Sequence, residues 1–305
     1  MKNASVSRWS IATLEGPAGP TGCLEVGDNC YALAPSLLRV GGPEITDVAD
    51  LFADWAAMEP LLASAAEAVD AADIVEGERL APLLYPGKIL CAGANYYKHC
   101  AEMGVTELAK EKQRLFFFFK PPRNAVVGPG DTVHMPLDTQ AFDWEVELAA
   151  VIGKRARAVS VEDALSHVAA YTVAIDFSAR DLNRAPETFY KLDWVAGKAQ
   201  ETSCPMGPSL IPASAVKNPQ ALPLSLSVNG EVKQDDTTGD MIFSIAEQIA
   251  TASRIMTLDP GDVILTGTPA GVGAPKGSFL AVGDTVEAAV DGIGTLKVTI
   301  QPPQA

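Results

Sequence analysis

Short runs of alternating apolar and polar residues occupy most of the chain, and this period-two pattern is typical of β-strands. Residues 8–13 and 21–26 are predicted strands, with glycine and proline interrupting the chain around them. From about Asp47 the apolar positions change to helical spacing, which predicts a helix. The stretch 76–87 contains two prolines and ends in Pro86-Gly87, so we place a domain boundary there.

Beyond Gly87 the pattern is richer in strands. Residues 88–92 form a predicted buried strand, and the run 115–119 is apolar at every position, which predicts a strand deep within a sheet. Asn229-Gly230 and Asp291-Gly292 each lie between two strand-like runs. Both dipeptides favour two-residue hairpin turns, because such turns need residues that tolerate a positive φ.

A helix is predicted after Ser244, which forms a capping box with Glu247 and is followed by apolar residues on one face. Antiparallel hairpins nevertheless dominate, and strands and helices do not alternate regularly. These features indicate the α+β class. We expect a small N-terminal α+β domain over residues 1–80 and the main domain over residues 85–305.

Composition narrows the classes of function. The net charge is −15 and no cluster of Lys and Arg is present, which argues against a nucleic acid partner. The five cysteines are odd in number and show no CxxC spacing, so a reducing compartment is expected. No signal peptide and no apolar run long enough to cross a membrane are visible. The sequence predicts a soluble cytoplasmic protein without a membrane partner.

Three acidic residues stand in otherwise apolar surroundings. Glu145 and Glu147 lie two apart in the predicted strand 143–153, so their side chains share one face. Asp176 interrupts a second apolar strand, residues 171–177. Glutamates at this spacing are often a solvated strand face, but a buried carboxylate requires a cation or hydrogen-bond donors. Three carboxylates without nearby Cys or His suit a hard cation such as Mg²⁺ or Mn²⁺.

His99 is the candidate general base. Glu102 follows three residues later on a short predicted helix, where a carboxylate can orient an imidazole and raise its basicity. From the spacing alone, an ordinary surface His–Glu pair explains the same pattern. His134 is interpreted as a structural strand residue, and His167 as a residue that packs or faces solvent.

Positive side chains follow the acidic residues. Arg180 and Lys198 can each bind a substrate carboxylate or form a salt bridge. The segment 267–273 is rich in glycine but lacks the features of a phosphate-binding loop, so nucleotide binding is not expected. Its small residues can instead bring backbone amides close to a substrate.

The chain resembles the fumarylacetoacetate hydrolase family from about Lys88 to the C-terminus. The resemblance is carried by these blocks in order: GANYYKHCAEMG, FFFFKPPRNAVVGPGD, DWEVELAAVIGK, YTVAIDFSARD, GKAQETSCPMGP, NGEVKQDDTTGDMIF and MTLDPGDVILTGTPAGVG. It implies a twisted mixed β-roll with flanking helices, a homodimer and, often, a small N-terminal domain.

The resemblance also implies roles for individual residues. It assigns Glu145, Glu147 and Asp176 to Mg²⁺ or Mn²⁺, His99 and Glu102 to water activation, Lys198 to catalysis, and Arg180 and Thr268 to substrate contacts. In the block around residue 200, Gln200 replaces an aromatic residue that is common in relatives. This difference indicates a more hydroxylated substrate, such as a diketo-deoxy sugar acid.

The expected activity is metal-dependent hydrolysis of a carbon–carbon bond in a small anionic 1,3-diketo acid, with release of pyruvate or a similar 2-oxo acid and a carboxylic acid. Two alternatives use the same metal site, namely decarboxylation of oxaloacetate-like acids and isomerisation of hydroxymuconate-type acids, and a fold alone does not choose between them. A non-catalytic metal-binding scaffold is a third alternative.

Overall fold

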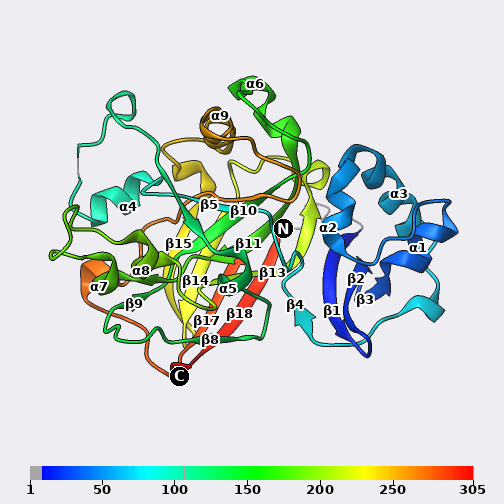
Figure 1. Cartoon of the computed structure of the whole chain (residues 1–305), viewed down its shortest axis with the longest axis horizontal. Coiled ribbons are helices and arrows are strands. Elements are labelled where there is room, and N and C mark those ends of the chain that lie inside the picture. Colours follow the sequence, from blue (N-terminus) through cyan, green and yellow to red (C-terminus); the bar gives the residue numbers. More distant parts are fainter. Residues whose placement is uncertain (1–8, 106, 305) are drawn as a thin grey trace.

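The computed structural model describes residues 9–105 and 107–304, so Arg8, the start of the first predicted strand, lies outside the described residues. The structure is of the predicted α+β class and is built around two mixed β-sheets with helices at their margins (Figure 1). The helices are α1 (Leu33–Arg39), α2 (Val48–Leu51), α3 (Trp55–Glu67), α4 (Tyr97–Glu102), α5 (Pro122–Ala125), α6 (Val161–Ala164), α7 (Arg180–Asn183), α8 (Trp194–Lys198) and α9 (Ile245–Ile255).

The larger sheet has eleven strands within the described residues. Their order is β3 (Asn29–Ala32), β2 (Gly19–Val26), β1 (Ser10–Gly16), β13 (Cys204–Pro212), β11 (Val168–Ile175), β10 (Val146–Ile152), β16 (Val263–Leu265), β5 (Ile89–Ala92) and β6 (Phe117–Lys120), with β4 (Arg79–Leu80) beside β1 and β7 (Val126–Val127) beside β13. Most neighbours are antiparallel, whereas β5 and β16 are parallel, as are β7 and β13.

A second sheet of five strands covers part of the first. Its order is β15 (Glu231–Thr237), β14 (Pro223–Val228), β17 (Thr285–Val290), β18 (Gly294–Gln301) and β8 (Thr132–His134). A two-stranded ribbon joins β9 (Phe142–Asp143) to β12 (Ser178–Ala179) near the ends of the central strands.

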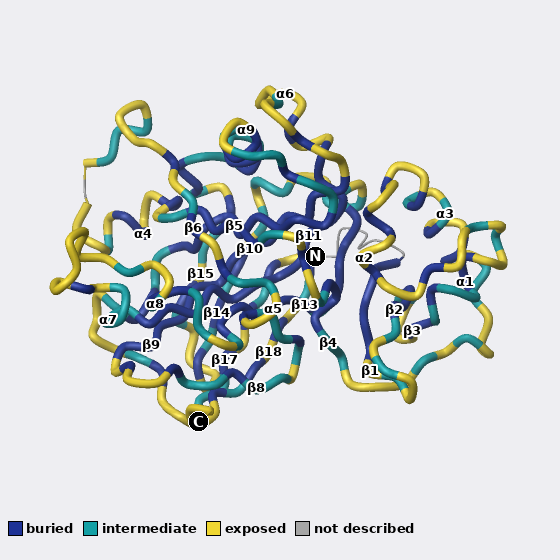
Figure 2. Tube along the Cα trace, viewed as in Figure 1, coloured by how far each residue is buried: buried dark blue, intermediate teal, exposed yellow. Residues whose placement is uncertain are grey.

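The central strand β10 separates two hydrophobic cores and is buried along its whole length (Figure 2). Val146 and Leu148 face one core, which they share with residues of the second sheet and α9. Ala149 and Val151 face the other core, which they share with the N-terminal helices. Because successive side chains alternate between faces, Glu147 points to the same side as Ala149.

The N-terminal segment joins the larger sheet directly. Ile11 of β1 pairs with Leu210 of β13, and both residues belong to the core that Ala149 and Val151 share with the N-terminal helices. The helix predicted from Asp47 is present, although a 3₁₀ turn at Phe52–Asp54 divides it into α2 and α3. The division of the chain between residues 80 and 85 stays a prediction.

The run 115–119 does not lie deep within the sheet as predicted. Strand β6 is the last strand of its sheet and pairs only with β5 among the described residues. Phe116 and Phe119 are 40% and 51% exposed, whereas Leu115 and Phe118 are buried. The prediction was wrong because a uniformly apolar run does not reveal which face is covered.

Two-residue turns were predicted at Asn229-Gly230 and at Asp291-Gly292, and only the first is present. Asn229 and Gly230 adopt φ values of 52° and 81° between β14 and β15, which confirms the two-residue turn. The turn after β17 has three residues instead of two, because Val290 pairs with Gly294 and Ile293 N–H donates to the Val290 carbonyl. A helix-capping box at Ser244 and Glu247 is also confirmed at the start of α9.

None of the helices in residues 9–105 and 107–304 is both long and apolar enough to span a membrane.

Candidate active site

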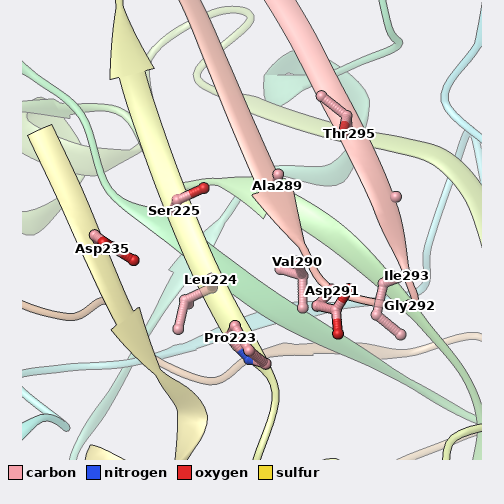
Figure 3. Close-up of a pocket in the computed structure, with 11 residues that line it drawn as sticks. Pro223, Leu224, Ser225, Asp235, Ala289, Val290, Asp291, Gly292, Ile293 and Thr295 are labelled. Carbon is pink, nitrogen blue, oxygen red and sulfur yellow. The ribbon is translucent and has the colours of Figure 1, made fainter. Parts of the chain in front are cut away.

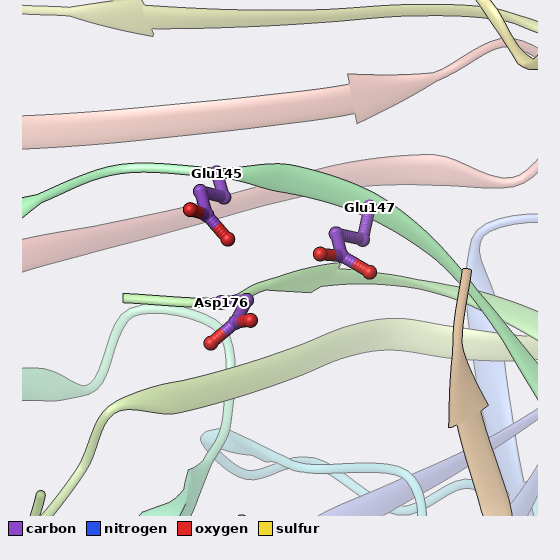
Figure 4. A group of neighbouring side chains, drawn as sticks. All are labelled: Glu145, Glu147 and Asp176. Atoms are coloured by element: carbon purple, nitrogen blue, oxygen red, sulfur yellow. The ribbon is translucent and has the colours of Figure 1, made fainter. Parts of the chain in front are cut away.

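Glu145, Glu147 and Asp176 converge where the central strands β10 and β11 begin and end, respectively (Figure 4). Strands β10 and β11 are antiparallel, so the start of one lies beside the end of the other, and Val146 pairs with Ile175. The backbone N–H of Asp176 donates to the Glu145 carbonyl at 2.9 Å. Each residue offers an oxygen within 4.8 Å of the others, so the three predicted metal ligands lie together.

The predicted continuous strand over residues 143–153 is interrupted. Asp143 ends β9, and β10 begins at Val146, so Trp144 and Glu145 lie between the two strands. The interruption follows from the two pairings, since Asp143 pairs with Ser178 of β12 whereas Val146 pairs with β11. Glu145 therefore lies just outside the strand that carries Glu147.

Two cationic side chains contact the carboxylates, the buried Lys198 and the half-buried Arg180. Lys198 Nζ lies 2.7 Å from Glu145 Oε2 and 2.8 Å from Asp176 Oδ2. Arg180 Nη2 lies 2.6 Å from Glu145 Oε1, and Arg180 Nε donates to Asp143 Oδ2 at 2.9 Å. The predicted positions Arg180 and Lys198 are thus brought to the acidic cluster.

The two glutamates differ in their electrostatic environment. Burial by itself would raise the pKa of Glu145, but Lys198 and Arg180 outweigh it and hold this pKa well below its ordinary value. Burial, together with the charges of Asp176 and Glu145, raises the pKa of Glu147. Glu147 Oε2 accepts the Gly267 N–H at 2.6 Å, and no side-chain ion pair of Glu147 is seen among the described residues.

Lys198 remains an ammonium in this environment. Its burial would lower the pKa, but the negative charges of Asp176 and Glu145 more than compensate and raise it. The charge of a protonated His99 also lowers the pKa of Glu145, which places the candidate base within electrostatic range of the same cluster.

The predicted dyad is formed. His99 is buried on α4, and its Nδ1 lies 2.8 Å from Glu102 Oε1. The other carboxylate oxygen of Glu102 accepts the Gly271 N–H at 2.8 Å. Because Nδ1 is engaged by Glu102, Nε2 is the ring atom that can accept a proton from substrate or water.

The glycine-rich segment 267–273 connects these groups through its backbone. Besides the bonds to Glu147 and Glu102, Gly273 N–H donates to Asp143 Oδ1 at 2.6 Å. Thr268 donates its hydroxyl to the Val146 carbonyl at 2.9 Å. The segment therefore contacts both the acidic cluster and the dyad, and its predicted approach to a substrate, with the contact by Thr268, stays a prediction.

Gln200 lies apart from the acidic cluster. Its Nε2 donates to the Ala196 carbonyl at 2.6 Å, and the side chain lines a small cavity of about 110 Å³ with His134 and Glu201. His134 and His167 both bind backbone carbonyls through Nδ1, in keeping with structural roles. A substrate contact by Gln200 stays a prediction.

Sequence reasoning missed three buried polar residues at this site, which are Asp143, Lys120 and Gln234. Gln234 accepts the Val146 N–H and donates to Thr268 Oγ1 and to the Pro269 carbonyl. A charged residue at the end of an apolar run was the available signal for Asp143 and Lys120. Gln234 gave no such signal, because it lies in a polar strand.

A groove of about 460 Å³ lies elsewhere, between β14, β15 and the turn after β17 (Figure 3). Pro223, Asp235 and Asp291 are among its lining residues, and none of the residues of the acidic cluster lines it. Its size alone assigns it no chemistry, and the predicted catalytic residues lie outside its lining.

The donor set fits a divalent cation. Three buried carboxylates supply only oxygen ligands, which hard cations prefer. The raised pKa of Glu147 reflects a buried carboxyl group whose negative charge lacks sufficient compensation, and a bound cation would provide it.

The family is shown by comparison with known proteins. Residues 88–301 match the family model described as "Fumarylacetoacetate (FAA) hydrolase C-terminal". The chain belongs to the fumarylacetoacetate hydrolase family, and it has the twisted mixed β-roll that the resemblance implied.

Named relatives differ in their reactions. A mitochondrial oxaloacetate tautomerase of Bos taurus is 42% identical over 219 residues, covering 71% of this chain and 67% of the relative. A 5-carboxymethyl-2-hydroxymuconate delta-isomerase from Mycobacterium smegmatis is 29% identical with a TM-score of 0.72, covering 97% of this chain and 100% of that one. A fumarylpyruvate hydrolase from Pseudomonas aeruginosa, solved with Mn²⁺ and pyruvate, is 35% identical with a TM-score of 0.65, covering 74% and 93%.

These relatives support an enzyme with a divalent metal and leave the reaction to be proposed. The cattle relative is named as mitochondrial, so the cytoplasmic location of this chain stays a prediction.

Proposed function

We propose that this chain is a divalent-metal-dependent hydrolase that cleaves a carbon–carbon bond in a small 1,3-diketo acid and releases pyruvate or a similar 2-oxo acid. The observation that carries the proposal is the combination of the buried triad Glu145, Glu147 and Asp176 with Lys198 and with the His99–Glu102 dyad in one site. The solved hydrolase relative, with Mn²⁺ and pyruvate, supports both the metal and the product class.

The triad would hold Mg²⁺ or Mn²⁺, and the bound ion would supply Lewis acidity toward the carbonyl oxygens of the substrate.

The charge balance of the site favours an anionic substrate. Four buried carboxylates meet three cationic side chains, so a divalent ion leaves the fully ionised site with a single positive charge. The seven residues are Asp143, Glu145, Glu147, Asp176, Lys120, Arg180 and Lys198.

Hydrolysis begins with general base catalysis. Glu102 orients His99, whose Nε2 accepts a proton from water while the water oxygen forms a bond to the distal carbonyl carbon. The bond between that carbon and the central CH₂ group then breaks, and its electron pair remains on the departing enolate. The Lys198 ammonium stabilises the enolate oxygen, and His99 returns the proton to carbon. The products are a carboxylic acid and a 2-oxo acid.

Oxaloacetate tautomerisation is a second candidate, favoured by the 42% identical relative that carries this name. It requires only proton transfer between carbon and oxygen, for which His99 is equally placed. No water attack and no second carboxylic acid product are involved, so the two reactions are separable by their products.

The test uses acylpyruvates, diketo-deoxy sugar acids and oxaloacetate with Mg²⁺, with Mn²⁺ and with EDTA. We expect metal-dependent release of equal amounts of a 2-oxo acid and a carboxylic acid from a diketo acid, and loss of this activity in Glu145→Gln and His99→Ala. Enol–keto conversion of oxaloacetate without cleavage of any diketo acid would assign the chain to tautomerisation, and CO₂ release would assign it to decarboxylation. Full activity in both variants would refute the assigned site.

We also propose a homodimer. The edge strand β6 exposes Phe119, and the loop between α7 and α8 exposes Phe189 and Tyr190 at 90% and 83%. Exposed aromatic groups of this kind are common at protein interfaces. Light scattering coupled to gel filtration should give twice the chain mass, and a monomer mass at micromolar concentration would contradict the proposal.

A further inference from the structure

Lys120 is a fully buried charged residue that the proposed mechanism does not use. It ends β6, and its side chain has no exposed surface. An ammonium group in the protein interior is costly unless oxygen atoms replace its hydration. The oxygen atoms around Lys120 Nζ therefore indicate which parts of the structure this ammonium group holds in place.

Oxygen atoms from three separate segments surround Lys120 Nζ. It donates to the carbonyls of Phe177 at 2.9 Å, Lys198 at 2.7 Å and Ser203 at 2.9 Å, and it lies 3.0 Å from Ser203 Oγ. Phe177 follows β11, Lys198 ends α8 and Ser203 precedes β13. The ammonium thus joins the ends of three elements at one point.

The same ammonium reaches the candidate metal ligands. Lys120 Nζ lies 2.9 Å from Asp176 Oδ1, whereas Lys198 Nζ binds Asp176 Oδ2. Lys198 is consequently constrained at both ends, because Lys120 binds its backbone carbonyl and the carboxylates bind its side-chain ammonium. Ser203 contributes to the same arrangement by donating its hydroxyl to the Gln200 carbonyl at 2.7 Å.

We propose that Lys120 is a positioning residue, which fixes the place of the Lys198 ammonium and of the Asp176 carboxylate without touching substrate. The proposal rests on the proposed function for the role of Lys198 in catalysis. It predicts that loss of the Lys120 charge impairs the chemical step more than it impairs metal binding. Removal of a positive charge near the triad cannot weaken the electrostatic attraction of the triad for a cation.

A lysine with only a structural role would behave differently. Lys88 is the control, since it also forms ion pairs, with Asp262 at 2.6 Å and Asp259 at 3.5 Å, and among the described residues it forms none with the acidic cluster. Its loss should lower stability and leave kcat and metal affinity at their wild-type values.

The test compares Lys120→Met, which keeps the length of the side chain and removes its charge, with Lys88→Met. We measure kcat and KM at saturating Mn²⁺ and the Mn²⁺ dissociation constant by electron paramagnetic resonance. For Lys120→Met we expect kcat to fall about 10- to 100-fold, in line with other residues that orient groups at metal sites. The Mn²⁺ dissociation constant should not rise. Unchanged kcat, or a fall in kcat accompanied by an equal loss of Mn²⁺ affinity, would overturn the proposal.

Two further measurements keep the proposal testable. If Lys120→Met does not fold, Ser203→Ala removes one oxygen around Nζ and retains the charge, and we expect a smaller loss of kcat at unchanged Mn²⁺ affinity. If the wild-type protein turns over none of the tested acids, the proposed function fails, while a crystal structure of Lys120→Met still tests Lys120. Lys198 Nζ within hydrogen-bond distance of both Glu145 and Asp176 in that structure would refute positioning.

Discussion

Glu145 and Glu147 show how strongly the surroundings of a residue decide its chemistry. They are two residues apart and both buried, yet Glu145 contacts Lys198 and Arg180 whereas Glu147 contacts the Gly267 amide. Opposite pKa shifts follow from this difference. Glu147 is accordingly the carboxylate whose ionised form benefits most from a bound cation.

Glu147→Gln should separate metal binding from folding. The substitution removes a negative charge that Asp176 and Glu145 repel, so the metal-free protein should keep or raise its Tm. Mn²⁺ should no longer raise the Tm, because one oxygen ligand and its charge are lost. Differential scanning calorimetry with Mn²⁺ and with EDTA measures both effects. Glu287→Gln, at an exposed position on β17, is the control and should retain the full Mn²⁺ shift.

Glu102→Gln should impair catalysis without impairing metal binding. Glutamine keeps the shape of the side chain but no longer offers two carboxylate oxygens to His99 and Gly271. We expect kcat to fall by at least about tenfold, and by no more than the roughly 10²–10⁴-fold that general base catalysis contributes as a whole. Steady-state kinetics at saturating Mn²⁺ measures this loss. An equal loss of Mn²⁺ affinity would show that Glu102 acts on the metal site instead.

At the scale of elements, the glycine-rich segment after β16 connects the dyad with the acidic cluster. Its backbone N–H groups reach Glu102 of α4, Asp143 of β9 and Glu147 of β10. The close approach needs glycine at position 271, where φ is 109° and an added Cβ would lie 2.1 Å from the Lys233 carbonyl oxygen. The segment is thereby a rigid connection between two catalytic groups.

Gly271→Ala should therefore disturb the active site from a position without a catalytic side chain. The new Cβ forces the segment away from β15, so Glu102 loses its amide donor and kcat falls. Gly283→Ala is the matched control, because its φ of 97° is equally unfavourable but open space surrounds it. We expect the control to lose about 1 kcal/mol of stability and no activity. Equal kcat in both variants would contradict this role.

Structural features that depend only on residues close together in the chain could be predicted from the sequence. The capping box, the turn at Asn229-Gly230 and the His99–Glu102 pair all arise within a few positions and were found as expected. The acidic cluster was also predictable, because two antiparallel strands bring the start of one to the end of the other. Contacts over long separations were not: nothing local indicates that Gly271 binds Glu102 or that Lys120 lies against Asp176.

At the scale of the whole molecule, an ion pair fastens the N-terminal strands to the body of the sheet. Glu25 of β2 pairs with Arg79 and accepts hydrogen bonds from Ser10 at 2.7 Å and from Ser209 of β13 at 2.6 Å. Burial would raise the pKa of Glu25, but these donors outweigh it and lower the pKa.

Glu25→Gln should destabilise the protein by about 1–2 kcal/mol at neutral pH, since the charged acceptor is lost. A lowered folded-state pKa gives stability that is fully present above the ordinary value of 4.5 and is lost as pH falls through the folded pKa. The difference in free energy of unfolding between wild type and variant should shrink as pH falls below 4.5. Urea denaturation at several pH values measures it, and a difference that grows in acid would contradict the assignment.

Strand β13 contacts the N-terminal strands, and its first residue adjoins the residues that surround Lys120 near the active site. Its first residue follows Ser203, which binds Lys120, and Leu210 further along pairs with Ile11 of β1. A shortened chain that begins near residue 85 would retain every catalytic side chain but leave this side of β13 without its neighbour. Unpaired backbone groups and an uncovered apolar face would then allow β13 of one molecule to pair with a strand of another. The N-terminal strands therefore also protect the protein from aggregation.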